Sequence, residues 1–443
     1  MIRHSSVETD SQNIFPTRRP ARLLRLLVLL GSPLVLMAES PSPSSPEVAG
    51  ETLSLRQAVR LATLHSPELK AVSWNTEGAL ARVRQARLWP NPEIEFEREN
   101  FGETGRFSGL DEAEDTLGIS QLLPLGRDLK YARRIAEAEH EQSTWDYHAA
   151  RLEVVLEATR QYIETLAAEG RMQLAERELQ LARQLESITL KRVESGDASP
   201  VEISRVTVPV VSAEIKHTRA GLALKASRQR LALLLGESGP YMGQLTGNLE
   251  SIAGLPSPEG LTGLINNSPV VGRWAAEISG RKAGRQLARA ESIPDPTLRF
   301  GIKRDRATGD EGLIVGISLP LPIFDRNQGA VSAARSAERA AHEERRAAGL
   351  RLERALSRQY FNLSASQAEA TALRDRVLPA ARRAYDATLK AFREGELPYL
   401  DVMDAARSLL EYEELYLEVL VDCHTANAEL DALLGGGLDQ TDL

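Results

Sequence analysis

The sequence predicts a mainly α-helical protein with a transmembrane β-barrel part, and three observations lead to this fold class. One series of motifs runs through the chain twice, the longest helical stretches carry heptad spacing, and four short segments alternate between apolar and charged residues. Aromatic residues make up only 5% of the chain, while Ala, Leu, Arg and Glu dominate its middle and C-terminal half. That composition suits long helices that pack through small side chains.

The two halves of the chain share five motifs in the same order and at nearly the same separation. Each match is weak alone because Pro and Gly occur in most loops, but five collinear matches indicate a duplication. The matches join Ser66-Pro67 to Ser268-Pro269, Pro90-Asn91-Pro92 to Pro294-Asp295-Pro296, Ile119-Ser120 to Ile317-Ser318, Gly196 to Gly395, and Leu234-Leu235-Gly236 to Leu433-Leu434-Gly435. We therefore expect a first repeat at 53–236, a linker at 237–260, a second repeat at 261–435 and a tail at 436–443.

Each repeat predicts the same elements in the same order: a helix, two strands, a very long helix, a Gly/Pro turn and a further helix. Ile135, Leu156 and Ile163 of the first long helix are separated by multiples of seven residues, the spacing of a left-handed coiled-coil seam. A plain coiled-coil rod has the same periodicity, so the heptads alone leave that fold open. The predicted helices are 55–89, 128–195 and 201–235 in the first repeat, and 261–292, 326–394 and 399–434 in the second.

Four segments have the period-two pattern of half-buried strands. In the first of them, Ile94 and Phe96 alternate with Glu95 and Glu97. About ten residues suffice to cross a bilayer as a tilted strand, and one apolar and one charged face is the pattern of a transmembrane barrel. A small soluble sheet that caps a helical bundle would alternate in the same way, but the export signal and the duplication favour the barrel. The predicted strands are 92–101, 115–124, 296–305 and 312–321.

Four strands are too few to close a barrel around a pore, and open strand edges are not tolerated in lipid. The chain must therefore assemble with copies of itself if these strands cross a membrane. Three copies related by a threefold axis give twelve strands, an even number within the usual range for bacterial barrels. We expect a homotrimer.

The first 38 residues have the features of an export signal. Arginines between positions 18 and 25 precede or enter an apolar stretch at 23–37, and small and polar residues follow. We expect a signal peptide at 1–38 and an N-terminal linker at 39–52. No later apolar stretch is long enough to suggest a transmembrane helix, so an exported chain of this kind is periplasmic, secreted or an outer-membrane barrel.

Composition and motif searches argue against several function classes. The net charge of −8 disfavours a nucleic-acid partner, which needs a basic face. The single cysteine, Cys423, excludes an internal disulfide and is best interpreted as a small buried hydrophobe. The histidines of the chain are never three or four residues apart, the spacing expected of metal ligands on one helix face. No phosphate loop, nucleophile elbow or zinc-protease motif occurs in the sequence. We expect no enzymatic activity, no cofactor and no metal centre.

Taken together, the duplicated order of elements resembles the TolC-like outer-membrane efflux factors over essentially the whole mature chain. The residues that carry the resemblance are 53–58 with 66–69, Leu319-Pro320-Leu321-Pro322-Ile323-Phe324-Asp325-Arg326-Asn327-Gln328-Gly329, and 395–404 with 409–410 and 432–435. The second stretch looks like the branch that serves cobalt-zinc-cadmium resistance pumps. The resemblance implies a trimer with a twelve-stranded barrel in the outer membrane, in contact with its lipid, and an α-helical tunnel in the periplasm. It also implies a periplasmic adaptor (membrane fusion protein) and an inner-membrane RND transporter as partners.

The resemblance places the Gly turns at the periplasmic tip and the gate beside the second turn. Asp401 and Asp404 match the family's aspartates that ring the tunnel entrance. Their i, i+3 spacing puts both carboxylates on one helix face near a helix start, where the dipole favours negative charge. In a trimer, six carboxylates would form a cation-attracting constriction. Alternatively, an aspartate near a helix start is only a capping residue or a residue that interacts with the helix dipole.

The first repeat differs at the equivalent positions, which are occupied by Glu202 and Arg205. One hypothesis is that Arg205 bridges to Asp401 or Asp404 of a neighbouring helix and holds the entrance shut. Exposed residues of the two turns are expected to dock the adaptor, although charged turns are often simply solvated. These docking residues are Ser195, Gly196, Asp197, Glu394, Gly395 and Glu396.

The expected function is a passive exit duct of a tripartite efflux system, with heavy-metal cations as the leading cargo. Drugs or organic toxicants, and proteins exported by type I secretion, are the alternative cargoes. From another class, a periplasmic coiled-coil scaffold or adaptor would also contain long helices. An adaptor, however, would carry a Gly/Val-rich lipoyl-like domain, which this sequence lacks, and a soluble scaffold would need no alternating strands.

Overall fold

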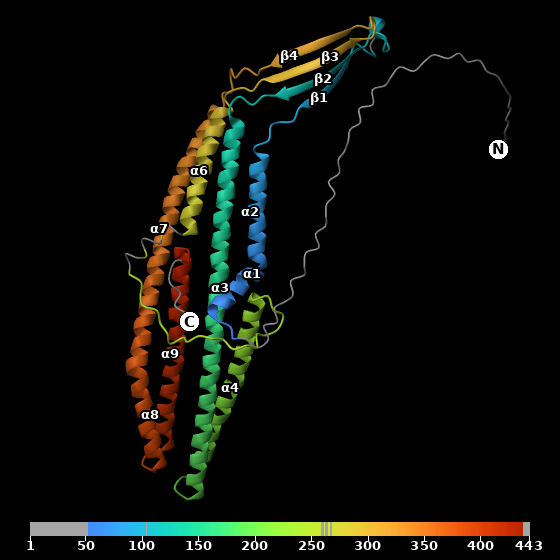
Figure 1. The fold of residues 1–443 in the computed structure, drawn as a ribbon. Coiled ribbons are helices and arrows are strands. Elements are labelled where there is room, and N and C mark those ends of the chain that lie inside the picture. The colour runs from blue at the N-terminus through green and yellow to red at the C-terminus, as the bar shows by residue number, and fades with distance from the viewer. Residues whose placement is uncertain (1–51, 103, 258–260, 262–264, 266–267, 437–443) are drawn as a thin grey trace, which may run out of the picture. The chain divides into compact units, whose positions relative to one another are not determined.

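The computed structural model describes residues 52–102, 104–257, 261, 265 and 268–436 (Figure 1). The signal peptide predicted at 1–38, most of the linker at 39–52 and the tail after Gly436 lie outside the described residues. In the first half, the elements are α1 (Leu55–His65), α2 (Pro67–Gln85), β1 (Glu93–Glu99), the short 3₁₀-helix η1 (Gly105–Phe107), β2 (Glu114–Leu122), α3 (Asp128–Glu194) and α4 (Val201–Leu234). In the second half they are α6 (Pro269–Ala290), β3 (Thr297–Asp305), β4 (Glu311–Ser318), α7 (Gln328–Ala372), η3 (Leu373–Val377), α8 (Leu378–Arg393) and α9 (Tyr399–Leu434). A mostly helical protein with four strands is therefore confirmed.

The long helix α3 confirms the element predicted at 128–195. Its 67 residues span about 100 Å at about 1.5 Å per residue. A residue in the left-handed conformation precedes each long helix, Arg127 with φ 65° before α3 and Asn327 with φ 57° before α7. The chain therefore enters both long helices through the same unusual backbone turn. None of the described helices is apolar over enough of its length to cross a membrane.

The helix predicted at 55–89 was wrong as a single element, because the structure breaks it at Ser66. This residue has φ −60° and ψ 116°, and its hydroxyl accepts a hydrogen bond from the Leu69 backbone N–H at 3.1 Å. The residue before a proline is disfavoured in the helical region, and Pro67 follows. Within the segment predicted as a helix at 261–292, α6 begins at Pro269, and Ser268 ahead of it is extended.

The second long helix, predicted at 326–394, is also not a single α-helix. A π-helical turn, η3, separates α7 from α8. Pro379 lies at the start of α8 and would clash in a regular α-helix with the carbonyl four residues earlier, that of Asp375. The wider turn contains this carbonyl, which explains why the irregularity lies directly before the proline.

The four strands form one antiparallel sheet in the order β1-β2-β3-β4. Strand β2 of the first half pairs with β3 of the second half, with Gly118 opposite Gly301. The predicted strands are confirmed, with ends that differ by at most three residues. For example, β1 ends at Glu99 because the next residue, Asn100, has a left-handed φ of 54°.

The helical core lies where α3 meets helices of both halves. Helix α3 packs against α2, α4, α6 and α9 (Figure 1). Ile163 and Ala167 of α3 form a buried cluster with Leu420 and Cys423 of α9. Cys423 is 1% exposed, and burial raises the pKa of its thiol to about 11, which confirms its interpretation as a small buried hydrophobe.

Segment 244–250 of the linker lies against α3 and α9. The fully buried Tyr162 of α3 donates a hydrogen bond to the carbonyl of Leu53 at 2.7 Å and also contacts the carbonyl of Thr246. Leu53 in turn pairs with the linker through its N–H, which donates to the Gln244 carbonyl at 2.8 Å. On the α9 side, a ring nitrogen of His424 lies 2.8 Å from the Leu249 carbonyl. The linker is thereby held between the two halves.

Substituting Gly272 by alanine should destabilise the protein. A Cβ atom on Gly272 of α6 would lie 2.3 Å from the Trp145 ring of α3, so the indole must move. Overpacking costs about 1–3 kcal/mol and helix propensity returns about 1 kcal/mol, so with so close a contact we expect a net loss of stability of up to about 2 kcal/mol. Thermal unfolding of Gly272→Ala, followed by circular dichroism, measures this. The matched control is Gly284→Ala in the same helix, where nothing lies within 4 Å of the new Cβ; equal melting temperatures for the two variants would contradict the packing argument.

Candidate functional site

The two hairpin turns, predicted as the tip, have the same backbone geometry. Gly196 with φ 83° ends α3, and Gly395 with φ 82° ends α8. In the first turn the Asp197 N–H donates to the Arg192 carbonyl at 2.8 Å, and in the second the Glu396 N–H donates to the Ala391 carbonyl at 2.9 Å. In each turn a glycine follows the helix, and the backbone N–H of the residue after the glycine donates to a carbonyl of the last helical turn.

All six residues predicted to dock a partner are exposed at these turns. Their side chains interact only locally. The Ser195 hydroxyl donates to the Asp197 carboxylate at 2.8 Å, and the Lys390 ammonium lies 4.0 Å from the Glu394 carboxylate. The turns therefore present carboxylates of Asp197, Glu394 and Glu396 to solvent, which leaves them available to a partner.

An apolar cluster, the tip cluster, joins the two hairpins just behind the turns. Phe392, at 0% exposure, lies edge-on to Tyr399 with 6.2 Å between the ring centroids. Arg192 of α3 lies over the Phe392 ring at 4.9 Å, and its guanidinium donates to the Phe392 carbonyl at 3.4 Å. The sequence prediction missed Arg192 and Phe392, because their contact joins residues of different halves. The remaining members of the cluster are Leu185, Val206 and Val402.

The predicted gate residues lie one or two turns beyond the hairpin turns. Asp401 and Asp404 are both exposed on α9, on either side of the fully buried Val402. Asp404 lies 3.8 Å from Arg407 on its own helix. The helix cap is Pro398, and no side chain forms a capping hydrogen bond there. No capping hydrogen bond is therefore observed at the start of α9, but Asp401 lies in its first turn, where the helix dipole favours negative charge.

The equivalent residues of the first half, Glu202 and Arg205, differ in exposure. Arg205 of α4 is exposed, and Glu202 is partly buried. Within the described residues of one chain, no ion pair joins Arg205 to Asp401 or Asp404. An ion pair between Arg205 and either aspartate therefore requires the aspartate of a neighbouring copy, and it stays a prediction.

The sheet has one apolar and one charged face, as the alternation predicts. Val315 and Leu313 of β4 are 74% and 85% exposed on the apolar face. Such exposure of large apolar side chains over a whole sheet face marks an interaction surface. The other exposed members of this face are Ile94, Phe96, Leu117, Ile119, Phe300, Ile302 and Ile317.

Ion pairs cross the opposite face of the sheet. Arg299 of β3 lies 3.1 Å from Glu95 and 3.5 Å from Glu97, both on β1. To reach them, its guanidinium crosses β2 above Gly118, where an added Cβ would lie 3.5 Å from the Arg299 Nε. The glycine lets the arginine lie flat along the sheet. Lys303 likewise contacts Glu99 and Glu114.

The described residues hold no group of three or more His, Cys, Asp or Glu side chains arranged to bind a metal ion. Several buried polar groups of the helices make structural contacts, such as the Thr165 hydroxyl, which lies 3.0 Å from that of Ser227.

Comparison with known proteins agrees with this architecture. The family model described as "Outer membrane efflux protein" matches residues 58–237 and 261–436. The chain is 31% identical to the cobalt-zinc-cadmium resistance protein CzcC of Cupriavidus metallidurans, over 93% of this chain and 98% of the relative. It is 27% identical to the nickel-cobalt-cadmium resistance protein NccC of Alcaligenes xylosoxydans xylosoxydans, over 74% and 73% of the two chains. Among solved structures, CusC superposes with a TM-score of 0.75 at 18% identity, covering 87% of this chain and 92% of that one.

Proposed function

The chain belongs to the outer membrane efflux protein family, and from this premise we propose that three copies of it form a passive exit duct for heavy-metal cations. Proteins of this family are efflux channels rather than enzymes. The chain is accordingly an outer-membrane protein with a helical extension in the periplasm. The proposal concerns its assembly, its partners and its cargo.

The observation that carries the proposal is the sheet with one exposed apolar face and two unpaired edges, β1 and β4. Apolar side chains such as Val315 and Phe300 would face lipid. In lipid, unpaired backbone groups at an edge are costly, because no water replaces the missing hydrogen bonds. Pairing β4 of one copy with β1 of the next removes every edge when three copies close into twelve strands.

The charged face of the sheet would then line the inside of the barrel. The Arg299 and Lys303 ion pairs with glutamates of β1 keep this face polar and compatible with water. A wide polar passage discriminates poorly between ions, so we assign the choice of cargo mainly to the adaptor and the inner-membrane RND transporter. The duct itself would be passive.

The gate is proposed at the narrow end of the helical tunnel. Three copies of Asp401 and Asp404 would place six carboxylates around one aperture, which attracts cations. Arg205 lies five residues after Pro200, and Asp404 lies six residues after Pro398, so the two side chains lie at similar depths behind their turns. Hairpins that alternate around the ring would bring Arg205 of one copy beside Asp404 of its neighbour and hold the aperture shut.

The hairpin turns are proposed as the docking surface for the periplasmic adaptor. The exposed carboxylates of Asp197, Glu394 and Glu396 leave this surface acidic. An adaptor tip with basic or hydrogen-bond-donating residues would complement it. The tip cluster supports the proposal, because it holds both turns in one rigid end that a partner can recognise.

Deleting the gene and measuring growth in the presence of toxicants tests the cargo. We expect greater sensitivity to zinc, cobalt or cadmium, restored by the wild-type gene, because CzcC and NccC are resistance proteins for such metals. Sensitivity to hydrophobic drugs should not change. Drug sensitivity with unchanged metal tolerance would instead assign the duct to organic toxicants and overturn the proposed cargo.

A further inference from the structure

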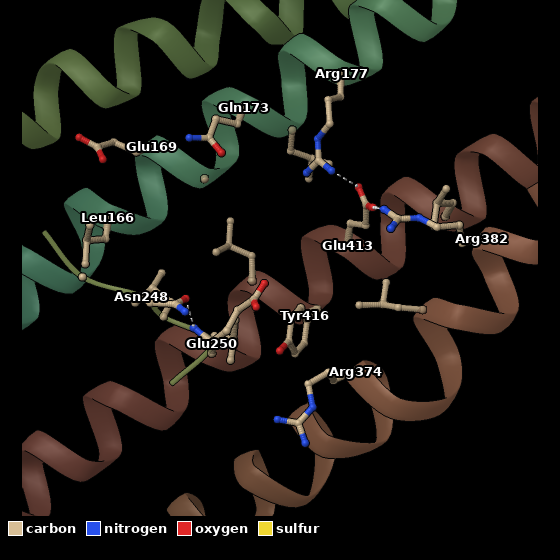
Figure 2. A pocket seen from close by; sticks show the side chains of 18 of the residues that line it. Leu166, Glu169, Gln173, Arg177, Asn248, Glu250, Arg374, Arg382, Glu413 and Tyr416 are labelled. Carbon is tan, nitrogen blue, oxygen red and sulfur yellow. Dashed lines mark hydrogen bonds and ion pairs between the residues drawn. The ribbon is translucent and has the colours of Figure 1, made fainter. Parts of the chain in front are cut away.

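A cavity of about 690 Å³ lies where the two halves of the chain and the linker meet, and we name it the junction cavity (Figure 2). Three helical segments line the cavity: α3, the η3–α8 segment and α9. In each segment the lining residues are one or two turns apart and therefore lie on a single helix face. Linker residues 245–250 close the fourth side. The volume falls within the range of small-molecule pockets, about 300–1,000 Å³.

The two ends of the junction cavity carry opposite surplus charge. At one end, Glu413 of α9 lies 2.9 Å from Arg382 and 3.4 Å from Arg177, so two guanidiniums share one carboxylate. At the other end, Arg374 forms an ion pair with Asp375 at 2.8 Å, while Glu250 adds a second carboxylate. One end therefore has an unmatched positive charge and the other an unmatched negative charge.

The floor between these ends is apolar and contains one polar group without a partner. Leu378, Leu417 and Leu420 line the cavity from α8 and α9. Tyr416 is 8% exposed, and its hydroxyl has no hydrogen-bond partner in the described structure. Figure 2 shows its ring on the cavity side of α9, between Glu250 and Arg374.

A buried hydroxyl without a partner is destabilising, and such groups are rare in native proteins. Burial raises the pKa of Tyr416, so the hydroxyl keeps its proton at neutral pH and can donate a hydrogen bond. The residue lies one helical turn from Glu413 on the same face of α9. The hydroxyl oxygen itself is buried, so a ligand in the cavity would contact the ring of Tyr416.

We propose that the junction cavity binds a small amphipathic zwitterion, such as an apolar amino acid or a short apolar peptide. Its carboxylate would lie at Arg177 and Arg382, its ammonium would lie near Glu250, and its apolar body would cover the leucine floor and the Tyr416 ring. This site is separate from the aperture and the turns. Because α3 and α8–α9 belong to different halves, an occupant bridges the two hairpins.

Three fluorinated probes of one shape and different charge test the proposal. 4-Trifluoromethyl-phenylalanine is a zwitterion, its N-acetyl derivative an anion and its methyl ester a cation. Binding to the full-length protein in a fluorine-free detergent is followed by ¹⁹F NMR, with empty micelles as the blank. We expect saturable binding of the zwitterion that is about tenfold tighter than that of either derivative, since each loses one charged contact. Equal binding of all three probes, or no saturable binding, overturns the proposal.

Two variants locate the site. Arg177→Gln and Glu250→Gln should each weaken binding of the zwitterion about three- to tenfold, because each removes one charged contact. A third variant, Tyr416→Phe, should raise the melting temperature of the free protein, because it removes the unpartnered hydroxyl, and should leave binding unchanged. The matched control is Tyr412→Phe, on the same helix but outside the cavity; it should bind as wild type does. Wild-type affinity in both Arg177→Gln and Glu250→Gln would place binding elsewhere and contradict the assignment.

Discussion

Replacing Asp404 by lysine should raise the single-channel conductance several-fold and reduce the preference for cations. In the proposed trimer, the substitution removes three carboxylates from the aperture and puts a lysine beside Arg205 of the neighbouring copy. Like charges at contact distance repel, so the aperture opens. Conductance of the purified protein in planar bilayers, with a salt gradient to give the ion selectivity, measures both effects.

Two further variants separate the gate from a general effect of charge. Glu411→Lys makes the same charge change two turns farther along α9, where the residue is also exposed; its conductance should stay near that of the wild type. The double variant Arg205→Glu/Asp404→Lys reverses the proposed pair and should restore low conductance. If Asp404→Lys conducts as the wild type does, the gate does not lie at this residue.

Replacing Val315 by arginine should greatly reduce the amount of protein in the outer membrane. Val315 lies near the middle of β4 on the apolar face and is 74% exposed. An arginine on the lipid face near the bilayer centre costs about 2–4 kcal/mol, and the proposed trimer contains three of them. Outer-membrane fractionation followed by immunoblotting measures the loss.

The adjacent residue supplies the control for this experiment. Ile314 pairs with Gly301, and Val315 pairs with Phe300, so their side chains point to opposite faces of the sheet. Ile314→Arg places the same charge on the polar face and should leave the amount of protein in the membrane near normal. Equal losses for the two variants would mean that the faces are not divided between lipid and water.

The elements with a short-range signal could be predicted from the sequence. Alternation between Ile94, Glu95 and Phe96 located β1, and Gly196 and Gly395 located the hairpin turns. The break at Ser66 had a local signal in Pro67 that the prediction did not use. The π-turn η3 gave less warning, because Pro379 is compatible with the start of an ordinary helix.

The contacts that join the two halves could not be predicted in the same way. The packing of Arg192 on Phe392, and the meeting of Arg177, Glu413 and Arg382, depend on how far one hairpin is displaced along the other. Heptad spacing indicates that helices pack, but it does not select the partner or its level. Only the three-dimensional arrangement brings such residues together.

Carbonate extraction of outer membranes, followed by electrophoresis with and without boiling, tests the central claim of a trimeric duct most directly. The proposed assembly has twelve strands in the membrane, so the protein should remain in the carbonate pellet. Unboiled samples should migrate as a species of three chains that becomes a single-chain band on boiling. A protein released by carbonate that migrates as a monomer without boiling would contradict the account.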